Sequence, residues 1–252
     1  MSLTTKPLIL VAIPAYNEEK SISSVLLKSK MYATLIVVCD DGSHDGTSRI
    51  AKASGAIVVR HEANLGYGAA LSTLFESARR IGPDVMLTLD ADGQHNPADI
   101  PKLAEPILKG WSDIVIGSRF LSNAGEERLP PYRKVGIRVI TRLTKRASYD
   151  TITDAQSGFR AYGRRAIRDI CPKIKGMGAS TEIIIRAKQL DLRIREMPII
   201  ASYYHKKRSE NPIAHGLEVM MSTLELIFSS CWRFFFRILV LLVLLVAVGL
   251  LI

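Results

Sequence analysis

The feature that most constrains this chain is a regular alternation of short apolar runs with segments of helical periodicity over its first half. The apolar runs that we expect to form strands lie at 8–13, 35–38, 56–60, 85–89 and 113–117. The segments that we expect to form helices lie at 18–30, 47–53, 69–81 and 101–108. Such alternation is typical of βαβ units, in which mostly parallel strands form one sheet between two layers of helices. We therefore predict an α/β fold.

The second half of the chain departs from this pattern. Residues 119–160 are basic and rich in loop-forming residues, with one helix expected at 133–146. A further helix is expected at 182–190, and a further strand at 193–200. We therefore expect one folded domain over residues 1–212, followed by a segment of different character.

The C-terminal segment is apolar enough to cross a membrane. Residues 234–252 carry one charge, Arg237, and residues 238–252 are apolar without interruption. A helix over 234–252 would be about 28 Å long, close to a hydrocarbon core of about 30 Å. A helix that packs on a domain surface would need a polar face, which this segment lacks. We predict a transmembrane helix at 233–252 rather than a core helix, and leave open whether the native chain continues with further spans.

The charges around this segment predict its orientation. Basic side chains precede the uninterrupted apolar run at 238–252 and none follows it; they are Lys206, Lys207, Arg208, Arg233 and Arg237. Because positive residues stay on the cytoplasmic side, the large domain is expected in the cytoplasm, held at the cell membrane. Between the two lies a juxtamembrane segment, 213–232, with an amphipathic stretch at 215–228. That stretch lies on the membrane surface or packs against the domain, and the sequence favours neither.

The overall charge narrows the classes of partner. The formal net charge of +10 favours an anionic partner, namely a nucleic acid, a phosphate-bearing substrate or an acidic membrane surface. No zinc-ligand spacing and no aromatic-interleaved basic patch supports nucleic acid, so none is predicted. The three cysteines, Cys39, Cys171 and Cys231, are far apart and form no CxxC pair. They therefore indicate neither a disulfide framework nor a zinc site.

Polar clusters follow three of the expected strands: YNE at 16–18, DD at 40–41 and DAD at 90–92. Because ligands of such sheets bind beyond the carboxyl ends of the strands, we expect these clusters to converge at one edge. Asp90 and Asp92 flank Ala91, and paired carboxylates are hard ligands suited to Mg²⁺ or Mn²⁺ together with diphosphate oxygens. Gln94 and His95 could complete or orient the coordination sphere. The alternative is an acidic turn that caps a helix at Pro97.

Two further turns have both a structural and a functional interpretation. The block DDGSHDGT at 40–47 is typical of an Asx-rich turn with a helix N-cap. The carboxylates of Asp40 and Asp41 are also well placed to accept hydrogen bonds from a nucleobase or ribose. The block NLGYGAA at 64–70 has Leu71 where a dinucleotide fingerprint has its third glycine, and it lacks the Lys-Ser/Thr of a P-loop. We interpret it as a tight turn near the nucleotide.

Six short blocks now occur in the order typical of one enzyme family. They are VAIPAYNEE at 11–19, DDGSHDGT at 40–47, NLG at 64–66, DADGQH at 90–95, GSRF at 117–120 and QSGFR at 156–160. Over residues 8–212 the chain resembles family 2 glycosyltransferases of the dolichyl-phosphate mannose synthase and polyprenyl-phosphate glucosyltransferase type. The resemblance implies a GT-A fold, which is a Rossmann-like sheet flanked by helices, an inverting mechanism, and Mn²⁺ or Mg²⁺ as cofactor.

The resemblance also implies a role for each matching residue. The nucleoside would be held by Pro14, Tyr16, Glu18 and Asp41. The metal and the diphosphate would be held at the Asp90-Ala91-Asp92 motif, with Asp90, Asp92 and Gln94 as metal ligands. Arg119 and Arg133 would face the phosphates or the lipid phosphate and, with Asp92, would be catalytic.

The chain departs from the family's mannose synthases near the end of the domain. An Arg-rich, Gly-containing segment of those enzymes is replaced here by YHKKRSENP at 204–212. Lys207 and Arg208 are expected to close over the diphosphate, with the residue that does so left open. This difference removes support for mannose in particular.

A cationic stripe adds a membrane surface to the expected partners. It consists of Lys134, Arg138, Arg142 and Arg146, which recur every four residues on one helical face. Such a stripe is either a solvated face or a single-signed surface for anionic headgroups, and the adjacent span favours the latter. Asp154 is expected to orient Arg160 or a loop, and Glu182 to line the acceptor side.

We therefore predict an inverting transferase that moves a sugar from a UDP- or GDP-sugar to a polyprenyl phosphate such as dolichyl phosphate. A phosphate monoester acceptor is already ionised near neutral pH, so it needs positioning more than a base. A different glycan or lipid acceptor, or a catalytically silent nucleotide-sugar-binding scaffold, stays open as an alternative. A processive polysaccharide synthase does not fit, because Ser230 stands where its QxxRW motif would have Gln. The sugar, the nucleoside, the polyprenol and a homo-oligomeric state are left open.

Overall fold

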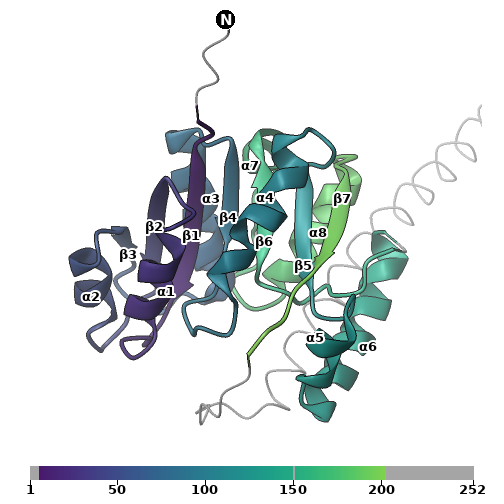
Figure 1. Cartoon of the computed structure of the whole chain (residues 1–252), viewed down its shortest axis with the longest axis horizontal. Helices are drawn as coiled ribbons and strands as arrows, with labels where there is room; N and C mark the ends of the chain where they lie inside the picture. Colours follow the sequence, from purple (N-terminus) through teal and green to yellow (C-terminus); the bar gives the residue numbers. More distant parts are fainter. Residues whose placement is uncertain (1–5, 150, 203–252) are drawn as a thin grey trace, which may run out of the picture.

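A computed structural model describes residues 6–149 and 151–202 of the chain. They form one seven-stranded sheet with the strand order β3-β2-β1-β4-β6-β5-β7 (Figure 1). The strands are β1 Ile9–Ala15, β2 Leu35–Asp40, β3 Ile57–Arg60, β4 Val85–Thr88, β5 Ile114–Ser118, β6 Arg160–Gly163 and β7 Ile194–Pro198. The α/β fold predicted from the alternating pattern is confirmed.

The helices follow the expected segments, with shifted ends. They are α1 Ile22–Ser29, α2 Thr47–Ala53, α3 Tyr67–Ile81, α4 Ile100–Leu108, α5 Asn123–Glu127, α6 Pro131–Ala147, α7 Arg164–Asp169 and α8 Ala179–Gln189. A 3₁₀ turn, Pro97–Asp99, precedes α4. The helix expected from residue 18 begins at Ile22 because the backbone first turns, with Ser21 N donating to Glu18 O. Helices α5 and α7 were not expected, because both are too short to show a helical period.

The sheet is parallel except at one strand. Strand β6 runs antiparallel between β4 and β5, whereas β1 pairs in parallel with β2 and β4, and β5 in parallel with β7. The sequence analysis left β6 inside a basic, loop-rich region, because a short strand that begins with Arg160 carries no apolar signal. Since Arg160 pairs with Thr88 at the end of β4, the chain just before β6 reaches the carboxyl edge of the parallel strands.

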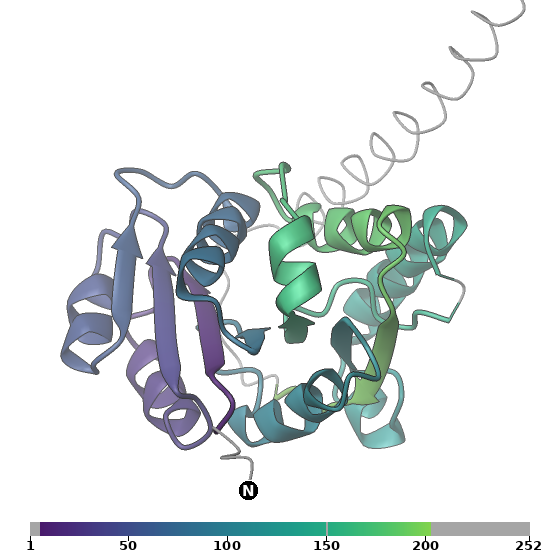
Figure 2. The same ribbon diagram turned by 90° about the horizontal axis from the view of Figure 1, so that it is seen from above.

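Helices cover both faces of the sheet (Figure 2). Each face has its own apolar core. Alternate residues of β1 point to opposite faces, so that Leu10 packs in one core and Val11 in the other. The first core includes buried side chains of α3, α7 and α8, and the second includes those of α1, α2 and α4. With both faces covered, the edge at the carboxyl ends of the strands is left for the polar clusters.

Three expectations fall on residues outside the described part. They are the juxtamembrane helix at 213–232, the transmembrane helix at 233–252, and the basic pair Lys207 and Arg208. Among the helices of residues 6–149 and 151–202, none combines the length and apolar character needed to cross a membrane.

Candidate functional site

Two loops at the carboxyl edge of the sheet are tied together by hydrogen bonds. Asn17, after β1, adopts a positive φ of 52°, a conformation that asparagine tolerates better than most residues. Its backbone N donates to Ser43 Oγ at 2.9 Å, and its side-chain oxygen accepts from His44 N at 2.9 Å. Glu18 N donates to Thr47 Oγ1 at 2.7 Å. These hydrogen bonds fix the loop after β1 and, with it, Tyr16, whose side chain is exposed.

Two of the predicted nucleoside ligands, Pro14 and Asp40, lie on the strands that lead into these two loops. Pro14 is buried within β1, opposite Cys39 of β2, so its ring lies in the sheet. Asp40, at the end of β2, is fully buried; its Oδ1 accepts from Ser43 N at 3.0 Å, and its Oδ2 lies 3.5 Å from Arg60 Nε. The contacts of Asp40 are therefore made inside the protein, and nucleoside binding stays a prediction for Pro14 and Asp40.

The side chain of Asp41 is hydrogen-bonded to a neighbouring turn. Its Oδ1 accepts from Leu65 N at 2.9 Å and its Oδ2 from Gly66 N at 2.8 Å, while His61 Nδ1 lies 2.7 Å from Oδ1. The carboxylate is buried, so these contacts are shielded from water. Asp41 thus fixes the glycine-rich turn directly, and its predicted contact with a nucleoside is untested.

The glycine-rich turn is closed to phosphate by the protein's own backbone. The first N–H groups of α3, those of Gly68 and Ala69, both donate to Lys175 O, at 2.6 and 3.2 Å. Glycine is needed at residue 66, where φ is 97° and a Cβ would lie 2.6 Å from the same carbonyl. This geometry agrees with our interpretation of 64–70 as a tight turn rather than a phosphate cradle.

The two carboxylates of the DAD motif lie just after β4. Asp92 Oδ1 accepts from Gln94 N at 2.9 Å, and Asp92 Oδ2 accepts from Gln94 Nε2 at 2.5 Å. Burial and then the neighbouring charge of Asp90 raise the pKa of Asp92 above its usual range. Two carboxylates that repel one another at a strand end favour a cation between them. Gln94 orients Asp92 here, and its role as a third metal ligand stays a prediction.

His95 lies next to the Asp90 carboxylate of the motif. Its Nε2 lies 3.3 Å from Asp90 Oδ2, and its ring packs edge-on against Phe159 at 5.4 Å. Burial lowers the pKa of His95 to about 4, so the ring is neutral near pH 7. A neutral ring whose Nε2 carries the proton donates to Asp90, which orients that carboxylate.

Gly158 is the close backbone neighbour of Asp90. Thr88 Oγ1 donates to Gly158 O at 2.7 Å, which holds the start of the β6 segment against β4. A Cβ at residue 158 would lie 2.5 Å from Asp90 Oδ2 and 2.7 Å from Oδ1. The glycine of the QSGFR block is therefore required by the DAD motif, a link that sequence spacing does not reveal.

Gly158→Ala should lower turnover about a hundredfold, because the added methyl group must displace the Asp90 carboxylate and a misplacement of about 1 Å can have that effect. The measurement is the steady-state rate of sugar transfer alongside a thermal melt. Gly136→Ala is the matched control, since nothing lies within 4 Å of a Cβ built at that helical glycine. Equal activities of the two variants would contradict the role given to Gly158.

Arg119 and Asp154 form a buried pair beside the motif. Arg119 Nε and Nη2 donate to the two carboxylate oxygens of Asp154 at 2.6 and 2.7 Å, and Arg119 N donates to Oδ2 at 3.2 Å. Asp154 was expected to orient Arg160 or a loop; the Arg160 alternative is wrong, and Asp154 accepts from Arg119 N directly after β5. Arg160 donates instead to three backbone carbonyls, those of Ala155, Ser157 and Ser180, because it is buried where the chain supplies no carboxylate.

Glu182 has its contacts within the protein. It is buried and accepts from Lys173 N and Ile174 N at 2.9 and 2.8 Å, with Arg186 Nε at 2.7 Å from its other oxygen. It therefore holds the loop at 173–174, and the expectation that Glu182 lines the acceptor side stays a prediction. A carboxylate that sequence reasoning missed, Glu196 of β7, holds the Asp154 segment by accepting from Thr153 N and Asp154 N.

Electrostatic interactions show which predicted residues come together. The charges of Asp90, His95 and Glu18 all act on Asp92, and those of Asp92, Arg119 and Asp154 act on His95. The carboxyl ends of β1, β4 and β5 therefore meet at one site. The strand-end argument named the clusters after β1, β2 and β4; the β2 cluster joins the β1 cluster through the bonds of Asn17 to Ser43 and His44, and the end of β5 was not among them. Ser202 also belongs here, since its backbone N donates to Gln94 O at 2.8 Å.

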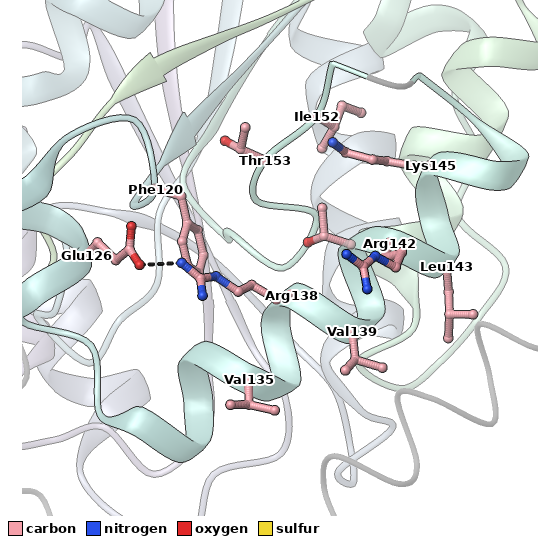
Figure 3. Close-up of a pocket in the computed structure, with 11 residues that line it drawn as sticks. Phe120, Glu126, Val135, Arg138, Val139, Arg142, Leu143, Lys145, Ile152 and Thr153 are labelled. Carbon is pink, nitrogen blue, oxygen red and sulfur yellow. Dashed lines mark hydrogen bonds and ion pairs between the residues drawn. The ribbon is translucent and has the colours of Figure 1, made fainter.

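Helix α6 carries Arg133 and the cationic stripe, and it borders a pocket of about 680 Å³ (Figure 3). The pocket lies between α6 and the segment with Ile152 and Thr153, and Phe120 forms part of its wall. Glu126 of α5 lies 3.1 Å from Lys134 Nζ and 2.5 Å from Arg138 Nη2, so an acidic side chain of another helix pairs with two residues of the stripe. Binding of anionic headgroups by the stripe stays a prediction. Val135 and Val139 remain exposed on the same helix.

The DAD motif fits a divalent cation. Its donor set consists of two carboxylates oriented by Gln94 and His95, and the described residues contain no group of three or more His, Cys, Asp or Glu that could cage an ion. Mg²⁺ is commonly bound by one or two carboxylates together with substrate phosphates, which is the arrangement this motif allows. Asp90 and Asp92 would hold the ion, with the charge of Glu18 acting on Asp92 and that of Arg119 acting on His95.

Known proteins are similar to this chain over most of its length. The family model described as "Glycosyl transferase family 2" matches residues 10–171. A UDP-N-acetylglucosamine–dolichyl-phosphate N-acetylglucosaminyltransferase of Methanococcus voltae is 33% identical, with 93% of this chain and 96% of that protein covered. A dolichyl-phosphate hexose transferase of Haloferax volcanii is 32% identical, with 85% of this chain and 92% of that protein covered.

A solved structure has the same fold. It is glucosyl-3-phosphoglycerate synthase of Mycobacterium tuberculosis in complex with Mn²⁺, uridine diphosphate and glucosyl-3-phosphoglycerate. The TM-score is 0.68 at 23% identity, over 87% of this chain and 79% of that one. The likeness is one of fold, and the expected GT-A architecture is confirmed by it.

Proposed function

This chain belongs to glycosyl transferase family 2, and from that premise we propose that it transfers a sugar from a UDP- or GDP-sugar to a polyprenyl phosphate at the cytoplasmic face of the membrane. The observation that carries the proposal is the Asp90 and Asp92 pair at a strand end, where the charge of Glu18 acts on Asp92 and that of Arg119 acts on the adjacent His95. Two relatives whose names specify dolichyl phosphate support the acceptor class.

The donor half of the site suits a nucleoside diphosphate as leaving group. Breaking the glycosidic bond places negative charge on that diphosphate, so groups that face it with positive charge lower the barrier. Mn²⁺ or Mg²⁺ held by Asp90 and Asp92 would supply this charge as a Lewis acid. Arg119, oriented by Asp154, would bind the phosphates. Lys207 and Arg208 follow Ser202, which is bonded to Gln94, and we propose that they add to this charge.

The acceptor half lies toward α6. Its pocket combines apolar side chains such as Phe120 and Val139 with the cationic groups of Arg138 and Arg142. An isoprenoid chain needs the first kind of surface, and a phosphate headgroup needs the second. We propose that the lipid lies along this pocket and that Arg133, in the first turns of α6, directs its phosphate toward the anomeric carbon.

The nucleophile requires no strong base in this arrangement. A lipid phosphate has a second pKa of about 6, so it is mostly ionised at neutral pH. His95 is neutral and faces Asp90, which fits a role in orienting the motif rather than in removing a proton. The residues of the site thus position two phosphate-bearing substrates, and direct attack by the acceptor oxygen inverts the anomeric centre.

The test is a transfer assay with the purified full-length chain in vesicles that contain dolichyl or undecaprenyl phosphate. With Mn²⁺ and one member of a panel of UDP- and GDP-sugars, we expect a lipid-linked sugar, and we expect EDTA to abolish its formation. Binding of UDP or GDP without turnover would instead identify a silent scaffold. Transfer to water or to a glycan, with no lipid product from any donor, would refute the proposed acceptor.

A further inference from the structure

His61, directly after β3, makes a set of buried contacts that the site described above does not use. Its Nδ1 lies 2.7 Å from Asp41 Oδ1, and its Nε2 lies 2.9 Å from Thr73 Oγ1 on α3. Its backbone N donates to Asp40 O at 2.9 Å. The same side chain therefore connects the carboxyl end of β2 with the first half of α3. Because a carboxylate only accepts, the proton on His61 must be at Nδ1 in the contact with Asp41.

The second partner of Asp41 is the glycine-rich turn. The Asp41 carboxylate, which accepts a hydrogen bond from His61, also accepts from Leu65 N and Gly66 N. The turn leads into α3, whose first N–H groups are bonded to Lys175 O. His61 and Asp41 therefore form a clamp that holds residues 64–66 against the end of β2. We use the name Asp41–His61 clamp for these two side chains.

Two other uses of this cluster are excluded by its chemistry. Cys39 Sγ lies 3.5 Å from His61 Nε2, which brings a thiol, an imidazole and a carboxylate together. Burial, reinforced by the charge of Asp41, raises the pKa of Cys39 to about 12, so the thiol stays protonated and is no nucleophile. No group of three or more His, Cys, Asp or Glu among the described residues could hold a metal ion, and this applies to the cluster around His61 as well.

We propose that His61 is a positioning residue for the sugar donor: through Asp41 it fixes the turn at 64–66 beside the strand end where the nucleoside binds. This inference rests on the proposed function for its link to the donor. Asp41 accepts from Leu65 N and Gly66 N, so His61 acts on the turn by holding this carboxylate in place. Loss of His61 removes one of the two donors to Asp41 Oδ1 and leaves the carboxylate held only by the turn itself, which loosens the turn.

Two nearly isosteric substitutions separate the two contacts of the ring. The amide nitrogen of asparagine can take the place of Nδ1, so His61→Asn keeps the donor to Asp41 and loses the contact with Thr73. The amide nitrogen of glutamine reaches the position of Nε2, so His61→Gln keeps the Thr73 side and loses the donor to Asp41. His61→Ala loses both. All three remove the same ring, and the pair therefore tests the Asp41 contact rather than the bulk of the side chain.

The first readout is hydrogen exchange at the Leu65 and Gly66 amides, measured on the full chain without ligand. We expect exchange about tenfold faster in His61→Ala and His61→Gln, because the acceptor of these amides loses its anchor, and near wild-type exchange in His61→Asn. This readout needs no activity, so it judges the clamp even where the proposed transfer reaction fails.

The second readout is the KM for the donor, compared with kcat and with the KM for the lipid acceptor. We expect the donor KM to rise about tenfold in His61→Ala and His61→Gln, with kcat and the acceptor KM within about twofold of wild type, and His61→Asn to restore the donor KM. Similar exchange and similar kinetics in His61→Asn and His61→Gln would overturn the inference. So would a lower melting temperature in all three variants with an unchanged donor KM.

Discussion

Replacing Asp92 with alanine is expected to lower turnover by at least about a thousandfold, while the melting temperature changes little. A metal that stabilises leaving-group charge contributes several kcal/mol, and each 1.36 kcal/mol corresponds to a factor of ten in rate. Asp92 is one of two carboxylates at the site, and its pKa is already raised by burial and by Asp90. Removing it relieves that repulsion, so the fold should tolerate the change.

A neighbouring carboxylate offers a matched control. Asp99 is half-buried, begins α4 and makes no capping bond from its side chain, so Asp99→Ala should keep nearly full turnover. Binding of Mn²⁺ in the presence of UDP or GDP, followed by electron paramagnetic resonance, measures the metal directly. Asp92→Ala should lose that binding and Asp99→Ala should retain it. Turnover within tenfold of wild type in Asp92→Ala would show that the motif does not carry the chemistry.

The parallel part of the fold was predictable because its signals are local. Each run such as 35–38 or 85–89 is apolar in itself and ends at a polar cluster, so the position of Asp40 or Asp90 at a strand end could be inferred. Strand β6 was missed because its place depends on partners far along the chain. Arg160, which begins it, is paired with Thr88 and has its charge satisfied by backbone carbonyls that no sequence window contains.

The same difference separates the predicted and the missed parts of the site. The donors of the DAD motif follow one another in the chain, so their spacing indicated a cation site. Their supports do not: Gly158 reaches Asp90 because β6 is antiparallel, and His61 reaches Asp41 because β3 lies beside β2. An isolated glycine in a motif is a signal of close backbone approach, and it could have indicated the first of these contacts.

Replacing Asp154 with alanine is expected to destabilise the domain by about 3–5 kcal/mol, since breaking a buried ion pair strands the other charge. Arg119 is 8% exposed and Asp154 is 0% exposed, so water cannot replace the lost carboxylate. The substitution also removes the two hydrogen bonds that the Arg119 guanidinium donates to Asp154 in a bidentate geometry. The measurement is the free energy of unfolding from urea titration. The surface pair of Glu76 and Arg80 is the control, and Glu76→Ala should change it by at most about 0.5 kcal/mol.

A double substitution distinguishes a stranded charge from a simple loss of packing. Removing both charges, as in Arg119→Met with Asp154→Leu, should destabilise less than Asp154→Ala alone, because no buried charge is left without a partner. If the double variant is the less stable one, packing rather than charge dominates this position. Asp154 would then matter to catalysis through the shape of the segment held by Glu196, rather than through the charge it offers to Arg119.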